Sequence, residues 1–332
     1  MVVLGIDTSN YRTSLCLIDQ NFQVLAEANP LLSVPEGSLG MQQSQAVFAH
    51  LKQWSRILTE LDIDASLKKQ IEAVGVSVAP RPVEGSYMPV FKVGEVLAET
   101  IASFLSVPLY RTTHQEGHIA AGEHTLTHQL PSPFLAVHLS GGTSEILLCQ
   151  RTKDGYAISR LGGTLDLHAG QLIDRVGVKL GFPFPSGPHL EREASQWEQR
   201  SGGDFPVVPS FVREGDFSFS GPATHLLRLI DRGEYTPGQI ARATEHLLVK
   251  TLEKALRYCL AKTHCSHILL VGGVTANRYL RLKLKEKLES RSSGVFLHFA
   301  NVAYATDNAF GVACLALRRL KMEKGKKEAH QP

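Results

Sequence analysis

The sequence predicts an α/β protein built from two similar domains, each with a mixed sheet covered by helices. Short apolar runs typical of strands alternate with longer segments typical of helices along the 332 residues. The order of three strands followed by alternating helices and strands occurs twice, once in each half of the chain. We therefore expect one domain at residues 1–125 and a second at 126–332, with no low-complexity linker between them.

The first half is expected to begin with three strands and to continue with two helix–strand pairs. The segments VVLGIDTS and RTSLCLID are apolar strands joined by a polar turn at Asn10 and Tyr11, and QVLAEANP forms the third strand. Helices follow near 42–61 and 92–105, each before a further strand, EAVGVSVAP and VPLYRT.

The second half repeats this order. FLAVHLSGG, SEILLCQ and YAISRLGG form the three strands, helices fill about 167–200 and 221–263, and HILLVGG is the next strand. A helix at 276–289, the strand VFLHFA and a last helix at 306–321 complete the half. The stretch 182–235 has no counterpart in the first half and carries several Pro and Gly residues, so we interpret it as a mainly helical insertion.

A duplicated unit of this kind, with glycine turns at matching places, is typical of the actin-like ATPase (ASKHA) fold, to which hexokinase and acetate kinase belong. By this analogy of pattern, a ligand is expected in the cleft between the two domains. The analogy does not determine the chemistry, which depends on the residues at the cleft.

The composition is that of an ordinary globular protein, with 43% hydrophobic and 20% charged residues. No apolar run reaches the roughly 18 residues that a membrane helix needs, and the first residues lack a signal-peptide pattern. The five cysteines are scattered, as expected for reduced thiols in a cytoplasmic protein. A net charge of +3 neither requires nor excludes a nucleic-acid partner.

The stretch TTHQEGHIAAGEH carries the strongest chemical signal. His114 and His118 are four residues apart at the start of an expected helix, so both imidazoles share one face and can reach one ion. The spacing is not the HExxH of zinc peptidases, because Glu116 is the third residue of the pentad. Asp307 in YATDNAF, at the start of another expected helix, would add a carboxylate, and this donor set suits non-haem iron or catalytic zinc.

Three glycine-rich turns are expected to face the cleft. LSGGTSE has Gly141 and Gly142, which let backbone amides approach an anion closely, and Ser140, which adds a hydroxyl. GIDTSN is the matching turn of the first half, where Asp7 could face a metal or a phosphate. The first pattern is also typical of a simple tight turn and the second of a satisfied strand end.

The third turn lies in LLVGGVTANRYL. A buried strand ends at Gly272 and Gly273, and a helix is expected to begin with Thr275 as its N-cap. Such a turn at the carboxyl edge of a parallel sheet is a standard nucleotide position, and Asn277 could bind a purine or ribose edge. Asp174, on a neighbouring helix, could accept from ribose hydroxyls, although its spacing fits an exposed residue without a role equally well.

Taken together, these motifs resemble the TsaD family of tRNA adenosine threonylcarbamoyltransferases, once described as glycoprotein endopeptidases. The matches run from GIDTS to TDNAFG, nearly the whole chain, and fall in the family's order: HQEGHIAA, LSGG, DRVGVKLGFPFPSGP, FSFSG, GGVTANRYLR and TDNA. The resemblance implies a metal site made by His114, His118 and Asp307. It implies substrate-binding residues at His138, Leu139, Ser140, Gly141, Gly142, Asp174, Gly187 and Asn277.

The resemblance also implies a reaction and its partners. A threonylcarbamoyl-adenylate made by a separate synthase would bind in the cleft, and one divalent metal ion, iron or zinc, would act on its threonylcarbamoyl end as a Lewis acid. The acceptor would be N6 of adenosine 37 in tRNAs that read codons starting with A. The implied partners are therefore tRNA and TsaB-like and TsaE-like proteins, with no membrane.

The chain departs from the family's pattern in the loops nearest the transferring group. The family usually reads GIETSCDET where this chain reads GIDTSNYRT, so Tyr11 and Arg12 replace an acidic pair. The family's SGGHT becomes SGGTS, its GPG turn becomes PRPVEGSY, and Thr113 stands where the family often has His or Asn. We expect Arg12 to have become a clamp for phosphate or carboxylate, and Arg12 and Ser140 to be the catalytic residues.

The sequence leaves two alternative functions open, and the second has the weaker support. The altered loops fit a divergent member of the family that binds metal and nucleotide without catalysing transfer, or that has another task. A metallopeptidase would need a general base within reach of a metal-bound water, and Glu116 is misplaced on its helix for that role.

Overall fold

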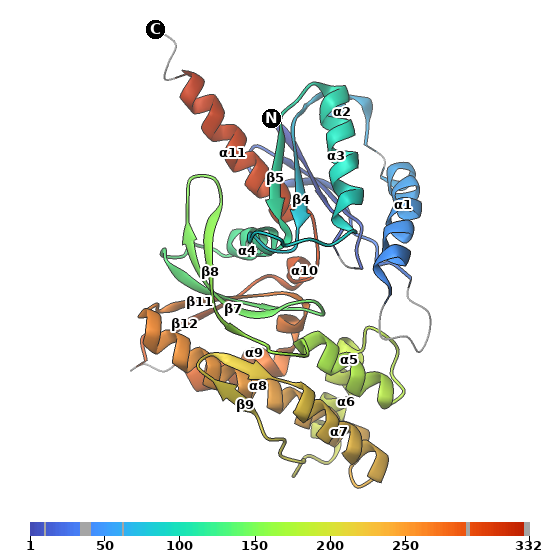
Figure 1. Cartoon of the computed structure of the whole chain (residues 1–332), viewed down its shortest axis with the longest axis vertical. Helices are drawn as coiled ribbons and strands as arrows, with labels where there is room; N and C mark the ends of the chain where they lie inside the picture. The colour runs from blue at the N-terminus through green and yellow to red at the C-terminus, as the bar shows by residue number, and fades with distance from the viewer. Residues whose placement is uncertain (10, 34–40, 62, 290–292, 329–332) are drawn as a thin grey trace.

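The computed structural model of the chain describes residues 1–9, 11–33, 41–61, 63–289 and 293–328. Two mixed sheets of five strands form its framework, one from each half of the sequence (Figure 1). The predicted α/β fold with two mixed sheets is therefore confirmed. Of the turn predicted at Asn10 and Tyr11, Asn10 lies outside the described residues.

The first sheet has the strand order β3-β2-β1-β4-β5. Strands β1, β2 and β3 pair antiparallel, and β4 and β5 continue the sheet parallel to β1. Helices cover both faces, so β1 and almost all of β2 are buried and read as apolar runs without alternation. The strands are β1 (Val2–Asp7), β2 (Ser14–Asp19), β3 (Val24–Ala28), β4 (Ile71–Ala79) and β5 (Leu109–Thr113).

The second sheet repeats this topology in the order β12-β11-β6-β7-β8. Three antiparallel strands are again followed by two strands parallel to the first. The duplicated plan read from the sequence is thus present in the strand connections. The strands are β6 (Phe134–Leu139), β7 (Ser144–Arg151), β8 (Tyr156–Gly163), β11 (His267–Val271) and β12 (Phe296–Phe299).

The helices pack around and between the two sheets. Those of the first half are α1 (Gln43–Glu60), α2 (Ala65–Lys69), α3 (Phe91–Leu105) and α4 (His114–His124). Those of the second half are α5 (Ala169–Lys179), α6 (Gly187–Arg200), α7 (Ser220–Arg232), α8 (Pro237–Thr263), α9 (Arg278–Leu288), α10 (Val302–Ala305) and α11 (Phe310–Glu328).

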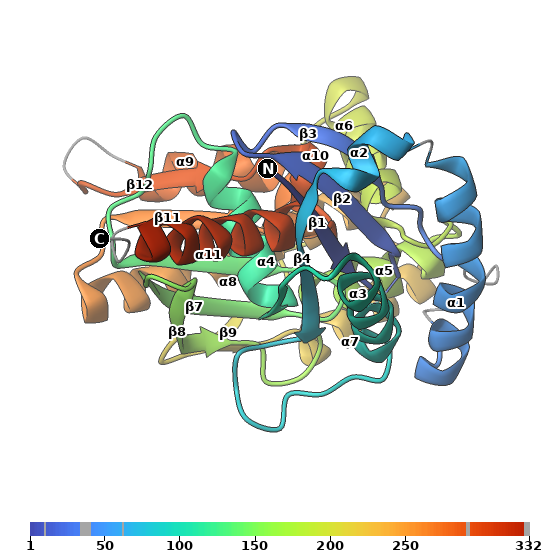
Figure 2. The same cartoon turned by 90° about the horizontal axis from the view of Figure 1, so that it is seen from above.

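Helix α11 belongs to the second half by sequence but packs on the first sheet. Its buried residues Phe310, Ala313 and Leu317 share one apolar core with Val3 and Ile18 of the first half. It also packs beside α4, as Figure 2 shows from above, and α4 contacts β11 of the second sheet. The two halves therefore share α4 and α11 at their junction, while the boundary at residues 125 and 126 stays a prediction.

Two long helices expected in the second half are each broken in the structure. The stretch 167–200 holds α5 and α6, because Gly181 with its positive φ of 87° and the prolines after it end the first helix. The stretch 221–263 holds α7 and α8, because Gly233 ends α7 in a left-handed conformation and Pro237 starts α8 at its first position.

Other element predictions were also incomplete. The insertion contains a small hairpin, β9 (Phe211–Arg213) with β10 (Asp216–Ser218), besides its helices. The last helix was expected from residue 306 but begins at Phe310, after the separate short α10. Among the described helices, none combines the length and the apolar character needed to span a membrane.

Candidate active site

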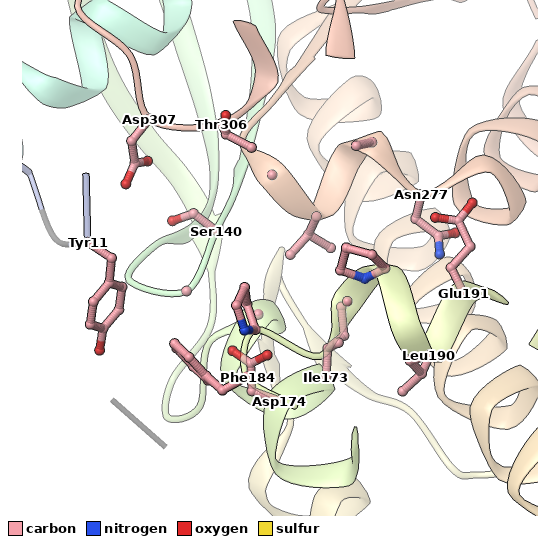
Figure 3. A pocket seen from close by; sticks show the side chains of 18 of the residues that line it. Tyr11, Ser140, Ile173, Asp174, Phe184, Leu190, Glu191, Asn277, Thr306 and Asp307 are labelled. Carbon is pink, nitrogen blue, oxygen red and sulfur yellow. The ribbon is translucent and has the colours of Figure 1, made fainter. Parts of the chain in front are cut away.

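A cavity of about 410 Å³ lies between the two halves of the chain. Figure 3 shows Asp307 and Ser140 toward one side of this cavity and Asn277 with Glu191 toward the other. The second half supplies most of the wall, and the first half contributes Tyr11, Arg12 and Leu31.

The N-terminus of α4 presents the predicted histidine pair. Thr113 caps the helix by accepting from the Glu116 amide, and the Glu116 carboxylate accepts in return from the Thr113 amide at 3.0 Å. This capping box starts the helix so that His114 and His118 lie one turn apart, with their Nε2 atoms 3.1 Å from each other. Glu116 is engaged at the cap and buried, so it is not placed to act as the general base of a peptidase.

Asp307 reaches the histidine pair because α4 and α11 cross without side chains between them. A Cβ on Gly311 would lie only 1.9 Å from the Gly117 carbonyl, so the crossing requires glycine there. Asp307 lies in the bend before α11, with Oδ1 3.2 Å from His118 Nε2 and 3.5 Å from His114 Nε2. The structure thus brings the three predicted metal ligands together.

Asp7, at the end of β1, holds His114 from the other side. Its Oδ2 lies 3.0 Å from His114 Nδ1 and accepts from the Ser77 hydroxyl at 2.5 Å. Burial alone would raise the pKa of Asp7, but the charge and hydrogen bond of His114 keep it below its ordinary value. Burial alone would lower the pKa of His114, but Asp7 and Asp307 together raise it to about 10.

The donor set fits a divalent metal ion. Ligand atoms that are each about 2.1 Å from one ion lie about 3.0 Å apart at octahedral corners and about 3.4 Å apart at tetrahedral corners. The three distances among His114, His118 and Asp307 are 3.1, 3.2 and 3.5 Å. The carboxylates of Asp7, which is buried, and Asp307 both face the imidazoles, which favours a cation at this point. A carboxylate on the far nitrogen of a ligating histidine is a common way to orient it.

The loop after β6 forms a tight turn whose polar groups hydrogen-bond to one another. The Ser140 hydroxyl accepts from the amides of Thr143 at 3.0 Å and Gly142 at 3.3 Å, so an anion would have to displace it to use them. Ser140 and Gly141 line the cavity, whereas Gly142 lies at the exposed tip of the turn.

The side chains of the two strand residues before this turn lie on opposite faces of β6, and neither lines the cavity. Leu139 is part of the core beneath the second sheet. His138 is 1% exposed and packs against His118, with the ring centroids 4.5 Å apart. The side chains of these two predicted substrate-binding residues therefore do not line the cavity.

The other end of the cavity combines an apolar wall with carboxylates that are partly or fully buried. Asp174 on α5 accepts from the Ser186 amide at 2.8 Å, and Gly187 begins α6 beside it. Burial raises the pKa of Asp174 to about 6, although the bond from Ser186 opposes this. The apolar part of the wall includes Ile173, Phe184, Pro185, Leu190, Leu248 and Val274.

The turn after β11 is built differently from its prediction. Thr275 was expected to cap the helix, but it lies in a 3₁₀ turn at Gly273–Ala276, and its hydroxyl donates to the Gly272 carbonyl. The N-cap of α9 is Asn277, whose Oδ1 accepts from the Leu280 amide at 2.8 Å. Because the 3₁₀ turn follows β11 directly, the N-cap of α9 lies two residues later than the predicted Thr275.

Glu245 is a cavity residue that sequence reasoning missed. It lies in the middle of α8, accepts from Asn277 Nδ2 at 2.6 Å and pairs with the buried Arg242 at 2.5 Å. Burial raises the pKa of Glu245 to about 7 despite the opposing effects of Asn277 and Arg242. No local motif marks it, because an acidic residue within a long helix is ordinarily exposed.

Tyr11 and Arg12, the residues of the first loop that depart from the pattern described above, lie at the mouth of the cavity. Tyr11 packs edge-on against Phe184, with ring centroids 5.6 Å apart, so the loop touches the second half. The Arg12 guanidinium donates to the Asn29 carbonyl, and Arg12 also lines the cavity. Arg12 therefore lies where a charged ligand group would enter.

Sequence comparison identifies the relatives of the chain. The family model described as tRNA N6-adenosine threonylcarbamoyltransferase (TsaD) matches residues 35–314. A protein of that name from Persephonella marina is 30% identical over 329 residues, covering 97% of this chain and 91% of its own length. One from Thermus thermophilus is 32% identical over 321 residues, covering 96% of this chain and 93% of its own length.

Solved structures resemble the chain in fold at low sequence identity. Full-length HypF in its phosphate- and nucleotide-bound form matches 98% of this chain and 47% of its own, with a TM-score of 0.56 and 16% identity. Component A of (R)-2-hydroxyglutaryl-CoA dehydratase from Acidaminococcus fermentans matches 97% and 99%, with a TM-score of 0.57 and 11% identity. The predicted actin-like ATPase fold is confirmed.

Proposed function

The chain belongs to the tRNA N6-adenosine threonylcarbamoyltransferase family, and we propose that it transfers threonylcarbamoyl from threonylcarbamoyl-AMP to N6 of adenosine 37 in tRNAs that read codons starting with A. The observation that carries this proposal is the juxtaposition of three candidate metal ligands and a cavity large enough for a nucleotide. The triad is His114, His118 and Asp307.

The triad would hold one divalent ion at the end of the cavity where the acyl group must react. When bound, such an ion supplies Lewis acidity that polarises the carbonyl of the threonylcarbamoyl group. Asp7 keeps the His114 ring oriented through its Nδ1, and Ser77 keeps Asp7 in place. Asp7 and Ser77 would therefore hold the His114 ring in the orientation in which it binds the ion.

The opposite end of the cavity would hold the adenylate. Its apolar wall excludes water from the base, and Asp174 can accept from a ribose hydroxyl with the oxygen that Ser186 leaves free. Arg12 at the mouth can pair with the phosphate or with the threonyl carboxylate. In the reaction N6 of adenosine forms the new C–N bond and loses a proton, while the C–O bond to phosphate breaks and AMP leaves.

The proposed partners are those that the family resemblance implies. The tRNA must present adenosine 37 unstacked from its loop, because a stacked base cannot reach a buried carbonyl. The adenylate comes from a separate synthase, and TsaB-like and TsaE-like proteins complete the assembly.

The test is transfer to a tRNA carrying unmodified adenosine 37, with a heterologous adenylate synthase and partner proteins supplied. The parent chain should be active, Arg12→Glu should lower the activity by at least about tenfold because it repels the anionic substrate, and Ser140→Ala should lower it less. A parent chain without activity, tested alongside an active relative, would contradict the proposal.

The position of Tyr11 and Arg12 at the cavity mouth favours one alternative, a member that binds metal and nucleotide but does not catalyse transfer. A variant with Tyr11→Asp, Arg12→Glu and Thr143→His restores the residues that the family carries there. Activity in this variant and none in the parent would identify the alternative as correct. Inactivity of both would count against threonylcarbamoyl transfer altogether.

A further inference from the structure

His138 is a buried imidazole without a visible partner. It lies near the end of β6, is 1% exposed, and neither ring nitrogen has a hydrogen-bond partner among the described residues. Leaving a polar group buried and unpaired costs free energy, typically about 1–3 kcal/mol. A second observation should therefore explain why the chain keeps a histidine at this position.

The carboxylate nearest along the sheet does not pair with it. Glu145 stands directly opposite His138 in the β6–β7 register. Its carboxylate is taken by Gln115, which donates at 2.8 Å, and by Arg81 at 3.3 Å. The His138 ring is thus left to face another group.

Strand alternation directs the His138 side chain toward α4. Val137 and Leu139 point into the core of the second half, whereas Phe134 and Ala136 pack with Ile119 of α4. His138 shares the face of Phe134 and Ala136, because alternate residues of a strand lie on one side.

The ring meets the metal-binding triad on that side. One ligating atom from each of His114, His118 and His138 can be chosen so that all three lie within 4.8 Å of one another. The ring centroid of His138 is 4.5 Å from that of His118 and 6.1 Å from that of His114. His138 is therefore the imidazole next to an ion that the triad would hold.

We infer that His138 is a fourth protein ligand of the ion, so that the site consists of three histidines and one aspartate. This inference rests on the metal site of the proposed function and assigns His138 to the ion instead of the substrate. Its neutral imidazole strengthens metal binding without adding charge.

A fourth protein ligand also limits which metal ion keeps a coordination position open for a substrate. Four protein ligands fill a tetrahedral zinc site completely, as in structural zinc sites. An octahedral ion such as Fe²⁺ would keep two positions for a substrate. The ligand set therefore favours a six-coordinate ion for any reaction in this cavity.

The test measures metal binding directly and does not depend on transfer activity. Metal-free protein is titrated with Co²⁺ in competition with a chromophoric chelator, and the visible spectrum of the bound Co²⁺ is recorded. His138→Leu, which suits the apolar neighbours, should weaken Co²⁺ binding at least about tenfold and change the spectrum. His124→Leu, on the same helix as the pair but packed against Phe310, should leave both unchanged.

An unchanged affinity and spectrum in His138→Leu would overturn the inference. If that variant does not fold, His138→Gln is used, and X-ray absorption of the metal-loaded parent counts the imidazole ligands. Three imidazoles support the inference and two overturn it. A parent chain that lacks transfer activity but loses metal affinity in His138→Leu would refute the proposed function and leave this inference standing.

Discussion

The two halves of the molecule begin with the same antiparallel hairpin, β1–β2 in the first half and β6–β7 in the second. The first connection is fixed by its neighbours. Thr8 donates to the Val90 carbonyl at 2.8 Å and accepts from the Gly94 amide of α3, and Thr13 donates to Gln53 of α1. The second connection is held by hydrogen bonds within its own turn. The Ser140 amide donates to the Thr143 carbonyl, and the Ser140 hydroxyl accepts from the Thr143 amide.

This difference shows how one duplicated element serves two tasks. The strand before the first connection ends in Asp7, which is committed to His114, so the first hairpin supports the metal end of the site. The turn of the second hairpin packs on α5, because the Gly170 amide donates to the Ser140 carbonyl at 3.1 Å, and α5 carries Asp174 of the nucleotide end. Substitutions at Asp7 and at the turn residue Ser140 should therefore affect different measurements.

Loss of a direct ligand should have the largest effect. His118→Ala or Asp307→Ala should each lower metal affinity by more than about 100-fold, because losses in the surrounding shell alone cost 10–100-fold. Elemental analysis after mild chelation measures the metal retained per chain. Variants that kept the parent's metal content would show that the site lies elsewhere.

A substitution at the close crossing of α4 and α11, where Gly117 meets Gly311, should have the next largest effect. Gly311→Ala places a Cβ against the Gly117 carbonyl, which should lower the free energy of unfolding by about 3 kcal/mol and reduce metal content by displacing Asp307. Gly325→Ala is the matched control, since a Cβ there meets nothing within 4 Å and alanine favours the helix. Equal stability of the two variants in urea unfolding would refute the close crossing.

The comparison between the hairpins is tested most directly by Asp7 and Ser140. Asp7→Asn should weaken metal binding by about 10–100-fold, since His114 loses its charged partner. Ser140→Ala should leave metal binding unchanged and cost about 1 kcal/mol of stability through the lost hydrogen bonds. The same chelator competition and urea unfolding measure both. A metal defect in Ser140→Ala equal to that of Asp7→Asn would remove the distinction between the hairpins.

The last effect concerns pH and the nucleotide end. The pKa of Asp174 in the folded protein, about 6, lies above its ordinary value, so the stability that its protonated form contributes is complete below about pH 4 and lost as pH rises through 6. Asp174→Asn removes this dependence and keeps the acceptor for Ser186. The variant's gain in free energy of unfolding over the parent should therefore be about 2 kcal/mol larger at pH 8 than at pH 4. Urea unfolding at both pH values checks this.

The same variant should bind AMP less tightly if Asp174 accepts from ribose, and a smaller thermal shift with AMP would reveal it. A variant with the parent's pH dependence would contradict the burial of this carboxylate. One with the parent's AMP affinity would remove Asp174 from the nucleotide site.

The repeated order of strands and helices was predictable because apolar runs and periodicity are local. Helix ends were less predictable. The breaks at Gly181 and Gly233 were overlooked, because glycine inside a helical pattern does not show whether its φ becomes positive. The start of α9 at Asn277 instead of Thr275 depended on how β11 ends.

The repeated element order predicted the fold class, and the spacing within one segment predicted the face shared by His114 and His118, while the family was recognised from the resemblance of motifs along the chain. The groups that meet this pair depend on the packing of distant elements. Asp7, Ser77 and Asp307 arrive from separate elements, and strand alternation directs a third histidine, from β6, to the same point. The crossing of α4 over α11 through two glycines sets these distances, and the contact of residues far apart in the chain leaves no local pattern.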